Sequence, residues 1–135
     1  MTIDDIANRL KSNYIADNLS TVRPTPKLLN NQEIVRLSEE ADLTRSAFYD
    51  EITLRIALGF QDGTFDFTFC DQIVNEIHSV IMAHDENRPN LYWEVFLAFD
   101  AGEHHRKEDK SDDPVEDFTR RLIAEFLRKH NARSN

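Results

Sequence analysis

Apolar residues recur at helical spacing from the start of the chain. Near the N-terminus they fall every three or four positions, and Thr2 followed by Asp5 has the form of a capping box. This pattern predicts a helix from Ile3 to about Asn18. A second capped, periodic segment predicts another helix from Asn31 to about Ala41, and the proline-containing stretch between the two is predicted to be a linker.

Residues 52–69 admit two interpretations. Every second residue from Ile52 to Leu58 is apolar, and three phenylalanines alternate in the same way after "QDG", as in a β-hairpin. Apolar residues also recur at four-residue spacing from a capped start at Thr44, which predicts a helix over 45–59. We favour the helix, and the hairpin remains the alternative that would make the domain α+β.

The rest of the chain predicts three more helices. One runs from about Phe69 to Ala83, a second from Asn90 to Gly102, and a third follows Asp113 with Pro114 at its first position. The expected core stripe of the last helix is Val115, Phe118, Leu122 and Phe126. We therefore expect one all-α domain over residues 1–135, a bundle of five to six helices.

The segment 90–102 is apolar on nearly every side of a helix. Such a helix is buried on all sides, so we expect a central aromatic helix wrapped by the others. The alternative is that a second copy of the chain covers part of it, which would make the protein a homodimer. The apolar residues concerned are Leu91, Tyr92, Trp93, Val95, Phe96, Leu97 and Phe99.

Charge and composition narrow the kinds of partner. The chain has 25 acidic and 16 basic residues, a net charge of -9, whereas nucleic-acid and anionic-membrane binders need a basic surface. The longest apolar run, Val95–Phe99, is too short to cross a bilayer. A single cysteine, Cys70, and an acidic N-terminus give no sign of export. We expect a cytoplasmic protein that binds neither nucleic acid nor membrane.

The best candidate for a binding site lies on the helix predicted over 69–83. Asp71, Asn75 and His78 follow one another at i, i+4 and i+7, and Met82 continues the stripe. A carboxylate, an amide and an imidazole on one stripe can bind a polar ligand or a metal ion, although the spacing is no known metal motif. The competing interpretation is that these are boundary residues bonded to neighbouring helices.

Three other positions carry weaker signals. Glu94 interrupts the apolar helix, where a carboxylate among aromatic rings would have a raised pKa and could serve as a general acid or base or bind a ligand. The adjacent His104 and His105 are expected to be surface residues, and Cys70 a buried apolar one. No motif for catalysis, nucleotide binding or zinc binding is present, so we expect no catalytic residue, metal or cofactor.

These observations favour a non-catalytic protein-interaction protein, of an adaptor or immunity-like kind, whose acidic helical faces bind a basic protein partner. The alternative is a helical bundle that binds a metal or small ligand through Asp71, Asn75, His78 and Glu94. The acidic residues expected on the binding faces are Asp4, Asp5, Glu39, Glu40, Asp42, Asp50 and Glu51.

Overall fold

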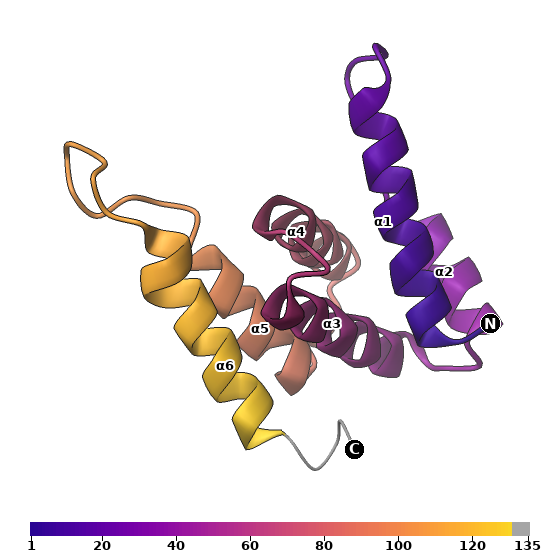
Figure 1. The fold of residues 1–135 in the computed structure, drawn as a ribbon. Helices are drawn as coiled ribbons and strands as arrows, with labels where there is room; N and C mark the ends of the chain where they lie inside the picture. Colours follow the sequence, from indigo (N-terminus) through magenta and orange to yellow (C-terminus); the bar gives the residue numbers. More distant parts are fainter. Residues whose placement is uncertain (131–135) are drawn as a thin grey trace.

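A computed structural model describes residues 1–130 of the chain, and within that range it is helical with no β-strand (Figure 1). The predicted all-α bundle is confirmed, and the alternative hairpin over 52–69 is wrong. The last five residues of the predicted domain lie outside the described part. The elements are α1 (Ile3–Leu19), α2 (Asn31–Glu40), α3 (Arg45–Asp62), α4 (Phe67–Ala83), α5 (Asn90–Asp100), the π-helical turn η1 (Val115–Thr119) and α6 (Arg120–Lys129).

Local side-chain caps explain where the first four helices begin. Thr2 accepts a hydrogen bond from the Asp5 amide, and the Asp5 carboxylate accepts one from the Thr2 amide, so the predicted capping box is confirmed. Single side-chain caps start the next three helices, and they are supplied by Asn30, Thr44 and Asp66.

Helix α3 ends three residues beyond its predicted end. Gly59 is buried inside the helix, and a Cβ atom there would collide with the Phe65 ring. The residue that ends the helix is Gly63, whose φ of 85° is left-handed and suits glycine. Gly59 is therefore present for close packing, and the stretch that resembled a hairpin is a helix followed by a tight turn.

Helix α5 lies in the middle of the molecule, packed against α3, α4 and α6 (Figure 1). Most of its side chains are buried, which confirms the predicted central helix, although it ends at Asp100 and Leu97 is 47% exposed. Its first turn lacks a cap from its own segment. The Asp50 carboxylate of α3 accepts a hydrogen bond from the Tyr92 amide at 2.9 Å instead. Asp50 thus stabilises the start of α5.

The core stripe of α6 differs from the predicted one. Phe126 is buried as expected, but Thr119 and Ile123 are the other fully buried positions, whereas Phe118 and Leu122 are only partly buried. The wider π-helical turn of η1 shifts the phase of the residues that follow, which explains the difference. In the described part of the chain, no helix combines the length and apolar character needed to span a membrane.

Candidate functional site

Carboxylates gather where α3 ends, α4 begins and α5 ends. Residues 51–100 contain nine acidic and two basic residues, so most of the net negative charge lies in this central segment. Phe99 of α5 packs against Phe60 of α3 and Phe67 of α4, with ring centroids 5.3 and 5.9 Å apart, which brings the three helix ends together. We call the acidic residues at these three helix ends the acidic end, and they are Asp62, Asp66, Asp71, Asp100 and Glu103.

In the described part of the chain, the basic side chains near the acidic end form no close ion pair with its carboxylates. Arg106 Nη1 donates to the His104 backbone oxygen at 2.6 Å, and the Arg120 guanidinium lies 4.3 Å from the Phe60 ring centroid. Within residues 1–130, the basic side chains within 4 Å of its carboxylates are Lys11, whose Nζ is 3.9 Å from Asp66, and His104, whose Nε2 is 3.9 Å from Glu103. Both separations are longer than a hydrogen bond, and such exposed pairs contribute little. Within residues 1–130, the carboxylates of the acidic end are therefore not neutralised by strong ion pairs.

Two of the predicted site residues, Asp71 and Asn75, meet at the acidic end. Asn75 Nδ2 donates to the backbone oxygen of Asp71 at 2.7 Å and to its carboxylate at 3.1 Å. The same nitrogen donates to Glu103 Oε2 at 3.0 Å. One side-chain amide thus bridges a carboxyl group on α4 and another in the loop after α5.

The crowding of these carboxyl groups alters the chemistry of Asp71. Burial, together with the hydrogen bond to Glu103 and the charge of that residue, raises the pKa of Asp71 to about 8, and nearby Asp100 acts in the same direction. The pair retains one proton near neutral pH. A cation placed beside it would favour the ionised form, and the proton would leave.

His78, the third residue of the predicted stripe, takes part in a different arrangement. Its ring stacks on Phe96 with centroids 4.6 Å apart, Phe96 stacks on Trp93, and the Arg88 guanidinium lies 3.9 Å from the Trp93 ring centroid. His78 Nδ1 is buried without a hydrogen-bond partner in residues 1–130. The same range contains no group of three His, Cys, Asp or Glu side chains arranged to hold a metal ion.

Glu94 has partners of its own on α6. Lys129 Nζ lies 2.7 Å from its carboxylate and His130 Nε2 lies 3.6 Å away. These contacts connect the middle of α5 to the end of α6. A ligand-binding role for Glu94 stays a prediction, as it does for His78.

The remaining candidates, His105 and Cys70, make contacts that suit a structural role. His105 Nδ1 lies 3.0 Å from the Asp112 carboxylate in an exposed loop, and Asp112 also accepts a hydrogen bond from the Arg106 amide. Cys70 is fully buried, and burial raises the pKa of its thiol. A thiol kept protonated in this way is a poor nucleophile.

Sequence reasoning missed Glu76, a buried carboxylate of α4. It accepts hydrogen bonds from the Leu29 amide at 2.7 Å, the Leu28 amide at 3.4 Å and Gln72 Nε2 at 2.9 Å. These bonds attach the linker between α1 and α2 to α4. The available signal was a charged residue within the apolar face of the predicted helix, between Ile73 and Val80.

Comparisons of the chain with family models, with curated proteins and with solved structures give no match. The class that can be stated is an all-α helical bundle. Any function must therefore be inferred from the chemistry of the molecule itself.

Proposed function

We propose that this protein is a non-catalytic interaction protein that binds a basic protein partner through the acidic end. The observation that carries the proposal is the contact that brings the Asp71 and Glu103 carboxyl groups together across Asn75, where burial and the neighbouring carboxyl groups raise the pKa of Asp71. A partner's Lys and Arg side chains would replace the proton that Asp71 retains and relieve the repulsion. Complementary charge of this kind speeds encounter and disfavours wrong partners.

The surroundings of the other chemical candidates favour binding over catalysis. The Cys70 thiol is buried and protonated, and the Glu94 carboxylate is paired with Lys129. Asp50, one of the acidic residues expected on a binding face, caps α5 instead. The exposed carboxylates Glu39 and Asp42 lie near the start of α3, at the other end of that helix from Asp62, and are not part of the acidic end. An adaptor or immunity-like role in the cytoplasm is the form of the proposal that fits these features.

Affinity capture with matched variants tests the proposal. The acidic-end variant replaces Asp62, Asp66 and Asp100 with Asn, which keeps an oxygen where Asp66 caps α4. The control carries the same change of charge at exposed positions elsewhere, as Asp85→Asn, Glu108→Gln and Glu125→Gln. Each protein is immobilised and exposed to a lysate of the native cell at low salt.

The wild type and the control should retain the same basic protein in stoichiometric amount and release it as salt increases. The acidic-end variant should retain at least about tenfold less of this partner protein, since several charge pairs of roughly 1 kcal/mol each would be lost. The proposal fails if no stoichiometric partner is retained, or if the acidic-end variant retains it as well as the control does.

Association with a second copy is a separate proposal. Leu97 of α5 is an apolar side chain that is 47% exposed, and Trp93, one turn earlier, is only partly buried. A self-association surface there would cover these side chains. Light scattering over a range of protein concentrations tests this association, and a mass that stays at the monomer value would contradict it.

A further inference from the structure

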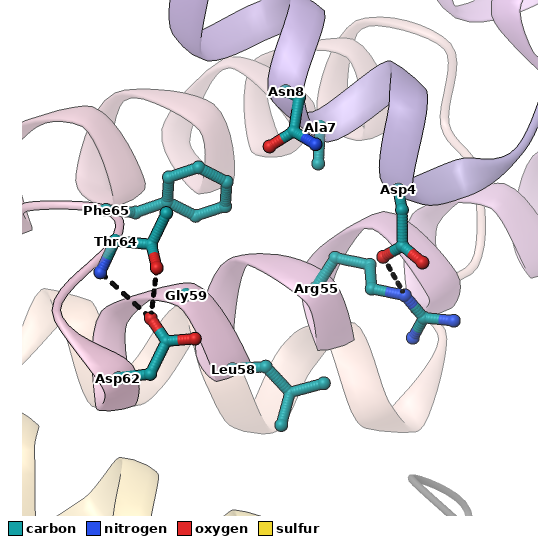
Figure 2. Close-up of a pocket in the computed structure, with 9 residues that line it drawn as sticks. All are labelled: Asp4, Ala7, Asn8, Arg55, Leu58, Gly59, Asp62, Thr64 and Phe65. Atoms are coloured by element: carbon teal, nitrogen blue, oxygen red, sulfur yellow. Dashed lines mark hydrogen bonds and ion pairs between the residues drawn. The ribbon is translucent and has the colours of Figure 1, made fainter.

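A pocket of about 390 Å³ opens between α1 and the second half of α3. Figure 2 shows Ala7 and Asn8 on α1, opposite Leu58 and Gly59 on α3, with the Phe65 ring at one side. A pocket of this size suits a side chain or a small molecule. Its lining is mainly polar, with Asp4 and Arg55 at one end, Asp62 and Thr64 at the other and Asn8 on α1.

The Phe65 ring packs directly on α3 and forms one wall of the pocket. Gly59 contributes no side chain, and the Phe65 ring occupies the space in which a Cβ atom would lie. The chain then turns at Gly63, where φ is 85°, so that residues 64 and 65 pass back over α3. At the opposite end, Arg55 Nε lies 2.8 Å from the Asp4 carboxylate and connects the two helices.

The two ends of the pocket differ in charge. Asp4 and Arg55 neutralise each other at one end. At the other, Asp62 Oδ1 accepts hydrogen bonds from the Thr64 amide at 2.8 Å and the Thr64 hydroxyl at 2.5 Å, and these bonds lower the pKa of Asp62. Asp62 is therefore ionised, and Oδ2 has no partner in residues 1–130. The pocket has one uncompensated negative charge.

We propose that this pocket accepts the side chain of an arginine from the basic partner. The guanidinium would donate to Asp62 Oδ2 and to the Asn8 amide oxygen, and its alkyl stem would lie over Ala7 and Leu58. A planar guanidinium presents several N–H donors in a fixed fork, so it can donate to two separate oxygens at once, which an ammonium does less well. The inference rests on the proposed function, since Asp62 belongs to both the acidic end and the pocket.

The test uses a minimal probe, N-acetyl-arginine methylamide, with the isosteric neutral citrulline derivative as its control. Binding is followed by NMR through the backbone amide signals of Gly59 and Thr64. The arginine probe should shift both signals, and the citrulline probe should leave them in place. Asp62→Asn keeps an oxygen that can accept from Thr64, and it should weaken binding of the arginine probe at least fivefold. The exposed control Asp85→Asn should leave that binding unchanged.

A second variant removes the space without removing charge. Asn8 is exposed on α1, so Asn8→Trp fills the pocket from outside the core and should also abolish the shifts. Three results would each overturn the inference: equal shifts with the citrulline probe, no shift of the Gly59 and Thr64 signals with the arginine probe, or undiminished binding of that probe by Asp62→Asn.

A peptide of six arginines separates this inference from the proposed function. If the peptide shifts the signals of Asp100 and Glu103 but not those of Gly59 and Thr64, the proposed arginine pocket is wrong and the proposed binding role of the acidic end is supported. If the single-arginine probe shifts the pocket signals but the peptide leaves Asp100 and Glu103 unmoved, the proposed function is wrong and the pocket stands as a guanidinium site.

Discussion

Two acidic residues of α4, Glu76 and Asp71, lie on the same helix and differ in what surrounds their carboxyl groups. Glu76 is buried, and two backbone amides and one side-chain amide donate to it. Asp71 is partly buried, receives a side-chain hydrogen bond from Asn75 alone, and lies beside Glu103 and Asp100. Burial raises the pKa of both groups, but the donors around Glu76 oppose the shift.

The difference separates a structural carboxylate from a candidate binding one. The buried Glu76 carboxylate already accepts hydrogen bonds from the amides of the linker, so it is not available to bind an external cation. Asp71 retains its proton because burial disfavours the ionised carboxylate and because Glu103 and Asp100 repel a further negative charge. A cation from outside can relieve that repulsion, which is why we assign the binding role to the end of α4 that carries Asp71.

The largest effect should come from Glu76→Ala. Removing the carboxylate leaves the Leu28 and Leu29 amides without an acceptor in a buried position, so unfolding should become easier by about 3 kcal/mol. Chemical denaturation measures the change. Glu76→Gln keeps one acceptor oxygen and should lose only about 1 kcal/mol. A loss below about 0.5 kcal/mol for the Ala variant would mean that the linker is not held by this residue.

Asp71→Asn should make the protein more stable, whereas Glu76→Ala should make it less stable. Because the folded-state pKa of Asp71 lies above its unfolded value, the native protein binds the extra proton between about pH 4 and pH 8, and its stability falls as the pH rises through that window. Asn removes this dependence, so the variant should gain up to about 1 kcal/mol relative to wild type near pH 8 and nothing near pH 4. Denaturation at the two pH values measures the gain.

The exposed control Asp85→Asn should show no such difference between the two pH values. If Asp71→Asn destabilises the protein at pH 8, the carboxyl group makes a favourable charged contact, and the contrast with Glu76 disappears.

The smallest effect is expected from Glu103→Gln. This change removes a like charge but keeps an oxygen that can accept from Asn75, so stability should change by less than about 0.5 kcal/mol. The pKa of Asp71 should nevertheless fall by roughly one unit or more, since its hydrogen bond to a charged neighbour is lost. Carboxyl NMR of Asp71 in the variant measures that shift, and an unchanged pKa would show that burial alone raises it.

Local signals in the sequence were enough to predict most of the fold. The caps at Thr2 and Thr44 and the spacing of apolar residues are properties of short segments, and the structure confirms them. The end of α3 was misplaced because the role of Gly59 depends on Phe65, which reaches it only after the chain turns. The stripe on α6 was misplaced because η1 changes the helical period.

The candidate site was predictable only within one helix. Asp71 and Asn75 are four residues apart, so their contact follows from helical geometry. Glu103 lies 28 residues beyond Asn75 and reaches it through the path of a loop, which no local pattern encodes. The same reason explains why Glu76, whose partners lie 47 and 48 residues earlier in the chain, was missed.

The most direct test of the account is the titration of the Asp71 carboxyl group by NMR, first alone and then with the six-arginine peptide. We predict a midpoint near pH 8 in the free protein, moving to lower pH when the peptide binds and the proton is released. An ordinary midpoint near pH 4 in the free protein, or one that the bound peptide does not move, would contradict the claim that crowded carboxylates at this end await a cationic partner.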